Sequence, residues 1–145
     1  MALPNKEEKI LISACLAGVN CKYNGGNNEN KKVIELIKNG NAILVCPEQL
    51  GGLMTPRTPA ERLKDKVITK DNHDVTEAYN RGANEVLSLV KRFNIKKAIL
   101  KSKSPSCGKG KIYDGTFSHT LTERDGVTTE LLMKNGVEVI TEEEI

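Results

Sequence analysis

In Ala42-Ile43-Leu44-Val45-Cys46-Pro47-Glu48, four apolar residues lead directly into a cysteine, a proline and a glutamate. A short apolar run bounded by turn signals indicates a buried strand. Pro47 has no N–H to donate, so the pairing of a sheet does not continue through it. The sequence therefore predicts that Cys46 and Glu48 lie just beyond the carboxyl end of a strand, in a loop that does not continue as regular structure.

Two further apolar runs are followed by a cysteine. Ile10-Leu11-Ile12-Ser13-Ala14 leads to Cys15, and Ala98-Ile99-Leu100 leads through a loop rich in serine to Cys107. In a parallel sheet, ligands bind outside the carboxyl ends of the strands. If these strands are neighbours, three thiols lie on one rim of the sheet. The sequence itself does not give the strand order.

Hydrophobic periodicity extends this pattern over the whole chain. Strands are predicted at 9–14, 42–45, 97–101 and 137–140, and helices at 29–38, 75–92 and 126–134. This alternation predicts an α/β fold in which residues 1–145 form one three-layer domain. Its mostly parallel sheet has about four or five strands, with helices on both faces. Residues 47–73 are expected to be irregular, with a short helical turn around Ala60–Leu63, and Glu142–Glu144 to be a solvated tail.

Composition narrows the class of protein. The net charge of +3 comes from Lys and Arg residues that are interleaved with acids, so no stable nucleic-acid binding is expected. No apolar run approaches 18 residues, and Met1–Glu8 contains two acids before a short apolar run. Neither a membrane span nor a signal peptide is therefore predicted, and the expected location is cytoplasmic. Aromatic residues make up only 3% of the chain, so the core must be aliphatic.

The four cysteines are expected to be reduced in the cytoplasm. They serve there as metal ligands, reactive thiols or buried apolar residues more often than as disulfides. No CxxC pair supports a zinc ribbon. One interpretation is an iron–sulfur cluster held by Cys15, Cys46 and Cys107, which leaves one iron open for substrate. Glu48 would then serve as general acid or base, and Ser104 would bind substrate or relay a proton. The alternative is that each cysteine only packs in the core.

For several other polar residues, the sequence is compatible with two roles each. Cys21 lies in a loop away from any strand end, so it is either a fourth ligand or, more simply, a packing or supporting residue. Arg57 sits in a stiff segment between two prolines and either binds a polar substrate or fixes the loop through a salt bridge. Lys101 and Lys103 either offset the charge of a cluster or are solvated. His73 and His119 are expected to be ordinary surface residues.

Six motifs together resemble one small family. They are Ser13-Ala14-Cys15-Leu16-Ala17-Gly18, Cys46-Pro47-Glu48-Gln49-Leu50-Gly51-Gly52, Thr55-Pro56-Arg57, Asp74-Val75-Thr76, Ser104-Pro105-Ser106-Cys107-Gly108 and Ile112-Tyr113-Asp114-Gly115-Thr116-Phe117. In this order, over nearly the whole chain, they resemble the thiouracil desulfidases, a family once described as a domain of unknown function.

The resemblance implies a compact α/β domain with a 4Fe–4S cluster on Cys15, Cys46 and Cys107. It also implies that Glu48 is the catalytic acid or base and Ser104 a second catalytic residue. The expected reaction is non-redox removal of sulfur from thiolated pyrimidines such as 2- or 4-thiouracil by hydrolysis, with sulfide passing through the open cluster iron. The expected partner is a small thio-nucleobase, and the expected state is a monomer or small homo-oligomer.

Two other functions remain open at the level of the sequence. One is a carrier module that holds a cluster or sulfide without turnover of its own. The other is a structural domain in which three or four thiolates hold zinc. The carrier differs from the enzyme in having no need for Glu48, and the zinc domain would give a colourless protein with one zinc under anaerobic preparation.

Overall fold

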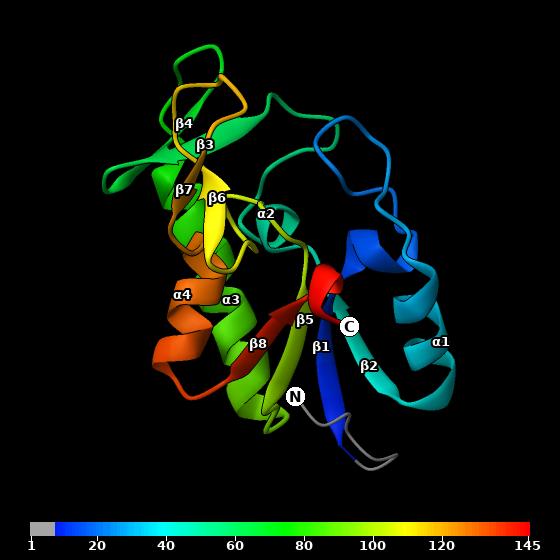
Figure 1. Cartoon of the computed structure of the whole chain (residues 1–145). Helices are drawn as coiled ribbons and strands as arrows, with labels where there is room; N and C mark the ends of the chain where they lie inside the picture. The colour runs from blue at the N-terminus through cyan, green and yellow to red at the C-terminus, as the bar shows by residue number, and fades with distance from the viewer. Residues whose placement is uncertain (1–7) are drawn as a thin grey trace.

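The computed structural model describes residues 8–145. The N-terminal segment Met1–Glu8, for which no signal peptide is predicted, therefore lies almost wholly outside the described residues. The centre of the fold is a four-stranded sheet in the order β2-β1-β5-β8, in which all three pairings are parallel (Figure 1). The strands are β1 (Lys9–Ser13), β2 (Asn41–Val45), β5 (Lys97–Leu100) and β8 (Glu138–Thr141). Ser13 pairs with Val45, so neighbouring strands end at the same edge.

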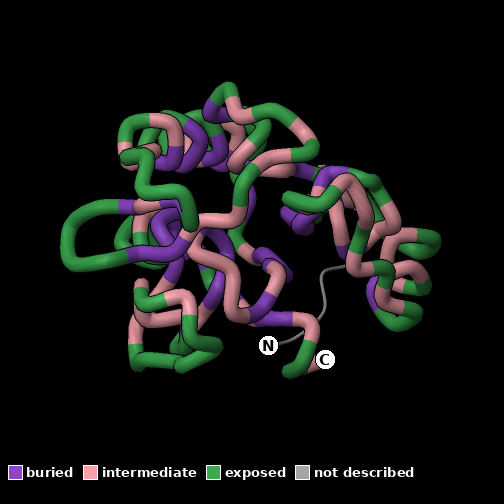
Figure 2. The backbone as a smooth tube through the Cα atoms, turned by 90° about the horizontal axis from the view of Figure 1, so that it is seen from above, coloured by how far each residue is buried: buried purple, intermediate pink, exposed green. Residues whose placement is uncertain are grey.

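Helices cover both faces of this sheet, as the alternating side chains of its strands require. Leu11 and Ala98 point to the face covered by α3 (Thr76–Arg92) and α4 (Val127–Lys134). The opposite face is covered by α1 (Lys31–Asn39), and its buried cluster is formed by Ile10, Ile12, Leu16, Val33 and Ile99. Figure 2 shows the buried segments in the interior and the exposed ones around them. The predicted three-layer α/β fold is confirmed.

The helices begin where local chemistry favours it. The side chain of Asn30 accepts hydrogen bonds from the backbone N–H groups of Lys32 and Val33, which satisfies two donors at the start of α1. In α3, Val86 and Val90 lie one helical turn apart and are both buried against the sheet. Within residues 8–145, no helix combines the length and apolar character needed to cross a membrane.

The prediction of an irregular segment over 47–73 is wrong. It contains the short helix α2 (Pro47–Leu50) and a hairpin of β3 (Ala60–Leu63) and β4 (Lys66–Thr69). The helical turn predicted around Ala60–Leu63 is instead strand β3. Its buried Glu61 and Arg62 find partners in distant loops, and these tertiary contacts override the helix propensity of the four residues.

A second hairpin joins β6 (Lys111–Tyr113) to β7 (Leu121–Glu123). Figure 1 shows both hairpins above the carboxyl edge of the central sheet, where β3 contacts β6. The segments in which the sequence predicts no strands therefore form hairpins. These hairpins enclose the edge of the central sheet at which the ligand site was predicted.

The prediction of a solvated tail at Glu142–Glu144 is also wrong. These residues form a 3-10 helix, η2 (Glu142–Glu144), which begins with a capping box between Thr141 and Glu144. The carboxylate of Glu142 turns inward and accepts a 2.7 Å hydrogen bond from the backbone N–H of Ser102. The segment is ordered here because the carboxylates of Glu142 and Glu144 find donors inside the fold, whereas Glu143 is exposed.

Candidate active site

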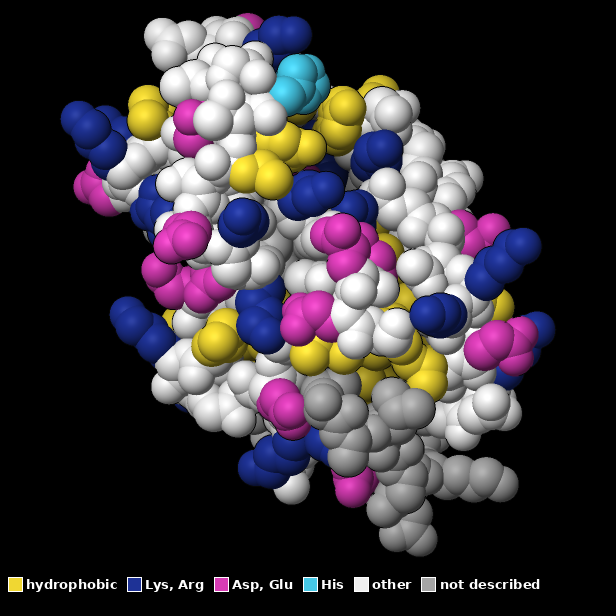
Figure 3. Space-filling model, viewed as in Figure 1, with side chains coloured by type: hydrophobic (Ala, Val, Ile, Leu, Met, Phe, Trp, Pro, Cys, Tyr) yellow, Lys and Arg dark blue, Asp and Glu magenta, His cyan; other side chains and the backbone are white. Residues whose placement is uncertain are grey.

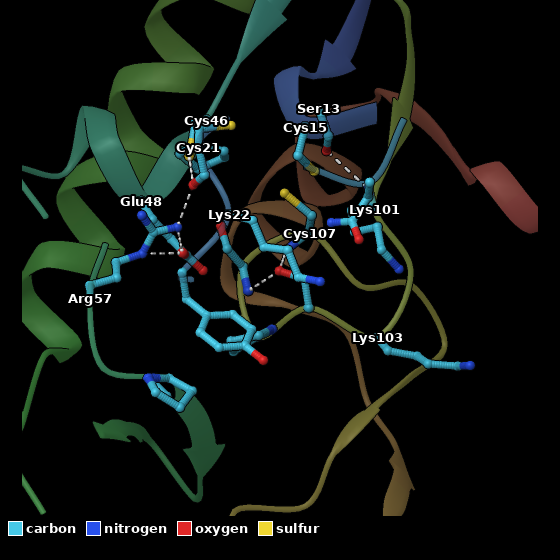
Figure 4. Close-up of a pocket in the computed structure, with 18 of the residues that line it drawn as sticks. Ser13, Cys15, Cys21, Lys22, Cys46, Glu48, Arg57, Lys101, Lys103 and Cys107 are labelled. Carbon is cyan, nitrogen blue, oxygen red and sulfur yellow. Dashed lines mark hydrogen bonds and ion pairs between the residues drawn. The ribbon is translucent and has the colours of Figure 1, made fainter. Parts of the chain in front are cut away.

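A cavity of about 520 Å³ opens at the carboxyl edge of the sheet. Its size falls within the range of about 300–1,000 Å³ that is usual for small-molecule sites. The structure brings to it every residue for which the sequence predicts a catalytic, cluster-binding or substrate-binding role. These lining residues are Cys15, Cys21, Cys46, Glu48, Arg57, Ser104 and Cys107. Figure 4 shows the four thiols around a common space, with Glu48 and Arg57 beside it.

Three different local structures present the thiols. Cys15 lies in the 3-10 helix η1 (Ala14–Ala17), which follows β1 directly. Cys46 follows β2 and is the N-cap of α2. Cys107 lies in a longer loop after β5 and is buried, with 5% of its surface exposed. The loop turns tightly at Gly108, where a Cβ atom would lie 2.7 Å from the carbonyl oxygen of Ser104.

The thiols differ in how readily they ionise. Burial raises the pKa of Cys15 and raises that of Cys107 to about 12. A hydrogen bond with Cys21 lowers the pKa of Cys46 to about 6, although burial opposes this shift. The same contact raises the pKa of Cys21. Cys46 is therefore the thiol that is most readily available as a thiolate, the form that binds metal.

Glu48 is held from both sides in the wall of the cavity. Its Oε1 accepts a 2.8 Å hydrogen bond from the hydroxyl of Tyr79, and its Oε2 accepts one of 2.8 Å from Nε of Arg57 and a second from Nη2. The side chain of Glu48 is 13% exposed and that of Arg57 is 10% exposed. Burial raises the pKa of Tyr79, and the adjacent carboxylate raises it further, so the phenol stays protonated and able to donate.

Arg57 uses its whole guanidinium group within the protein. Besides Glu48, its N–H groups donate to the carbonyl oxygen of Cys21 at 2.9 Å, to that of Met54 at 3.2 Å and to Oγ1 of Thr55 at 2.9 Å. Arginine has five N–H donors, and each of the five has a partner here. The sequence left open whether Arg57 binds substrate or forms a salt bridge. In the structure Arg57 forms a salt bridge, and its partner is the predicted catalytic carboxylate of Glu48.

Helix α2, which carries Glu48, packs on α3 through two glycines. A Cβ atom on Gly51 would lie 2.0 Å from the carbonyl oxygen of Ala78, and one on Gly82 would lie 1.9 Å from that of Pro47. No side chain fits at either position without moving a helix. This close backbone contact fixes the distance between Glu48 on α2 and Tyr79 on α3.

Ser104 shapes the loop of Cys107. Its Oγ accepts hydrogen bonds from the backbone N–H of Ser106 at 3.1 Å and from that of Cys107 at 3.0 Å. A hydroxyl group has two acceptor lone pairs and one proton. Since both lone pairs are engaged, Ser104 faces the cavity as a hydrogen-bond donor.

The start of the same loop is anchored by two residues that the sequence did not single out. The buried Ser13 accepts a 2.9 Å hydrogen bond from the backbone N–H of Lys101, and its hydroxyl partly offsets the rise that burial causes in the pKa of Cys107. Glu142 accepts from the hydroxyl of Ser102 at 2.7 Å and pairs with Lys101 at 3.3 Å. Lys101 is therefore an anchored lysine rather than a solvated one.

The donor set fits an iron–sulfur cluster. Cys15, Cys46 and Cys107 are free thiols in one cavity, and thiolates are the usual ligands of such clusters. Basic side chains also line this cavity, namely those of Lys22, Arg57, Lys70, Lys101 and Lys103. Figure 3 shows Lys and Arg side chains gathered beside hydrophobic ones on this face. Within residues 8–145, no three His, Cys, Asp or Glu side chains are grouped closely enough to hold a single metal ion.

Tyr79 and Glu61 are cavity residues that the sequence did not reveal as functional. Tyr79 falls on the apolar face of α3. The only feature of the sequence that could have pointed to a functional role is its hydroxyl group among aliphatic neighbours. Glu61 lies in the segment predicted to be helical. His119 also lines the cavity, whereas His73 lies outside it and pairs with Asp71 at 3.2 Å near the surface.

Comparisons with known proteins place the whole domain among related chains. The family model described as 2-thiouracil desulfurase matches residues 10–144. The uncharacterised protein YbbK of Bacillus subtilis (strain 168) is 42% identical over 146 residues, which cover 94% of this chain and 97% of YbbK. A solved structure of the [4Fe-4S]-dependent thiouracil desulfidase TudS superposes with a TM-score of 0.90 at 41% identity, covering 95% of this chain and 93% of TudS.

Proposed function

Because this chain belongs to the 2-thiouracil desulfurase family, we propose that it hydrolyses thiolated pyrimidines of the 2- or 4-thiouracil type with the help of a 4Fe–4S cluster. The ligands would be Cys15, Cys46 and Cys107. Cys21 contacts Cys46 and would support it rather than bind iron. The net reaction replaces C=S by C=O and releases hydrogen sulfide, with water as the only co-reactant and no change of oxidation state. The free thiols agree with a reducing, cytoplasmic location.

When bound, a cluster with three protein ligands has one iron free to polarise the sulfur of a thiocarbonyl group. Every other element of the mechanism belongs to the chain itself. Glu48 would accept the proton of the water that attacks the ring carbon. Arg57 and Tyr79 hold its two carboxylate oxygens, so the base is oriented before substrate arrives. Arg57 would thus act on the substrate through Glu48.

Ser104 would complete the site as a donor. Its two lone pairs are engaged by backbone N–H groups, which leaves its O–H to hydrogen-bond the ring or the attacking water. The observation that carries the proposal is the placement of Glu48, clamped and nearly buried, in the same cavity as the three thiols. A carrier module would have no use for a carboxylate held in this way.

The test is anaerobic reconstitution with iron and sulfide, followed by an absorption spectrum and assays of sulfide and uracil released from 4-thiouracil. Cys15→Ala, Cys46→Ala and Cys107→Ala should each lose the visible absorption of the cluster. Glu48→Gln should keep it and lower kcat by about 100-fold or more, the usual contribution of a general base. Glu85→Gln, an exposed change on α3, is the matched control. A cluster without turnover in the wild type would favour the carrier, and no cluster under any condition would overturn the proposal.

A further inference from the structure

The aromatic side chains of this chain are concentrated at the cavity. The sequence has three Tyr, two Phe and no Trp, and its core is aliphatic. Four of these five rings line the cavity, namely those of Tyr23, Tyr79, Tyr113 and Phe117. The fifth, Phe93, lies at the end of α3 and is exposed. Tyr79 is buried in the core and donates to Glu48, but the core does not use the other three rings, so these are explained by what the cavity binds.

Two cavity-lining residues of the loop between β6 and β7 have positive φ. Phe117 has φ of +56°, in the left-handed region that bulky side chains rarely adopt, and His119 has φ of +59°. Such conformations persist only where the surrounding structure imposes them, and they occur preferentially at functional sites. The loop between β6 and β7 is therefore held in place rather than relaxed.

Glu61 is the residue that holds it. Its Oε1 accepts hydrogen bonds from the backbone N–H of Gly115 at 2.9 Å and from that of Phe117 at 3.1 Å. Glu61 is itself buried in β3, with 9% of its surface exposed. At Gly115 the loop lies so close to β3 that a Cβ atom would be 2.8 Å from the carbonyl oxygen of Arg62.

The rest of the loop is ordered by short-range contacts. Oδ1 of Asp114 accepts a 3.0 Å hydrogen bond from the backbone N–H of Thr116, a turn that aspartate favours. The ring of Tyr113 meets that of His119 edge to face, with centroids 6.2 Å apart and planes at 83°. Tyr113 and Phe117 are thus presented to the cavity from a rigid hairpin.

We propose that Phe117 and Tyr113 form a stacking surface for the flat ring of the substrate, and that Glu61 is the positioning residue that holds this surface in the cavity. The choice of a pyrimidine ring as ligand rests on the proposed function. Stacking on aromatic side chains depends on the π-face of a ring and not on its sulfur. The surface therefore selects planar heteroaromatic thiones over open-chain thioamides that carry the same C=S group.

The first measurement is the Kd of 4-thiouracil, by equilibrium dialysis against the reconstituted Glu48→Gln protein, which binds without appreciable turnover. Phe117→Asn removes the ring but keeps a residue that tolerates positive φ. It should weaken binding by about 5- to 150-fold, the range for loss of one base–aromatic stack. Phe117→Tyr should stay within about twofold of the parent, and Phe93→Ala is the control for losing a ring elsewhere.

Glu61 is tested by a conservative pair of variants. Glu61→Ala should weaken binding much as Phe117→Asn does, whereas Glu61→Gln should restore most of it because an amide oxygen also accepts two N–H bonds. In otherwise wild-type enzyme, Phe117→Asn should raise KM for 4-thiouracil with kcat little changed. The kcat/KM for thioacetamide should not change. A loss of fold alone would affect both substrates.

The outcomes separate this inference from the proposed function. Binding of 4-thiouracil that depends on Phe117, without any turnover in the wild type, would establish the stacking surface and remove the proposed reaction. Turnover with a Kd and KM that Phe117→Asn leaves unchanged would overturn the stacking surface and keep the reaction. No measurable binding of 4-thiouracil by any form would also overturn the stacking surface.

Discussion

The hydroxyl of Tyr79 lies 2.8 Å from Oε1 of Glu48 and donates its proton to that oxygen, while Arg57 donates to Oε2. The two donors come from α3 and from the loop after α2, so three separate segments meet at one carboxylate. Neither oxygen of Glu48 can rotate away without breaking a hydrogen bond. The cavity therefore contains a carboxylate whose direction is fixed by the fold.

Removal of the Tyr79 hydroxyl should slow the reaction without unfolding the protein. Tyr79→Phe keeps the ring in place and removes one hydrogen bond to a charged group, worth about 1.5–3 kcal/mol. We expect kcat to fall by at least about 10-fold, with KM within about twofold of the wild type, in a steady-state assay of the reconstituted enzyme. An unchanged kcat would show that the orientation of Glu48 does not depend on Tyr79.

The same residue should make stability depend on alkaline pH. Burial raises the pKa of Tyr79 above its ordinary value of 10.0. The unfolded chain therefore releases this proton above pH 10 while the folded chain keeps it, so folding loses stability as pH rises beyond 10. The expected slope is about 1.4 kcal/mol per pH unit. Urea unfolding of wild type and Tyr79→Phe between pH 8 and 11 should show the extra slope only in the wild type.

Arg57→Gln should be strongly destabilising. It leaves the Glu48 carboxylate nearly buried without its cationic partner, and breaking such a pair on one side costs about 3–5 kcal/mol. Lys38→Gln removes the partner of Glu35 in a pair whose side chains are 66% and 69% exposed. That matched control should cost no more than about 1 kcal/mol in the same denaturation experiment. Equal losses in the two variants would contradict a buried, functional ion pair.

Gly82→Ala should separate α2 from α3. Its new Cβ would lie 1.9 Å from the carbonyl oxygen of Pro47, so the helix that carries Glu48 must shift. Overpacking of this kind costs about 1–3 kcal/mol. We expect a lower thermal unfolding midpoint and reduced turnover, whereas Gly40→Ala, whose Cβ would have an ordinary 3.5 Å contact, should retain both. Retention of full turnover by Gly82→Ala would mean that Glu48 tolerates movement of its helix.

Glu142 should make the protein sensitive to acid. Burial opposes ionisation of this carboxyl, but hydrogen bonds from Ser102 and the charge of Lys101 lower its pKa below the ordinary 4.5. Its contribution to folding is therefore present above pH 4.5 and lost as pH falls toward the lowered value. Between pH 6 and 3, Glu142→Gln should lose less stability than the wild type, and the exposed Glu143→Gln should follow the wild type. Parallel curves for all three proteins would contradict this role.

Apolar runs and helical periodicity were enough to predict the central fold. The strands ending at Ser13 and Val45 and the helix over 76–92 lie within about a residue or two of their predicted bounds, because their side chains bury on predictable faces. The placement of the thiols at one edge could also be predicted from the sequence, because the carboxyl ends of neighbouring parallel strands lie at the same edge of a sheet. The strand order was not predictable, because it depends on which apolar faces meet.

What the sequence could not reveal depends on contacts between distant residues. Ala60–Leu63 has the composition of a helix, and only the partners of Glu61 and Arg62 make it a strand. Glu142 stands in a run of acids that looks solvated, yet its partner Ser102 is 40 residues away. Tyr79 follows the apolar pattern of its helix, so its hydrogen bond to Glu48 is visible only once α2 and α3 are placed together.

A chain leaving the ribosome displays Cys15 and Cys46 long before Cys107, because α3 and β5 separate the third thiol from the first two. Glu142, which anchors the start of the Cys107 loop, is translated later still. A nascent chain thus carries the first two proposed ligands, with Cys21 between them, before the third has been made. The three proposed ligands are therefore all present only after β5 and the loop that follows it have been made, and the anchor of that loop arrives last.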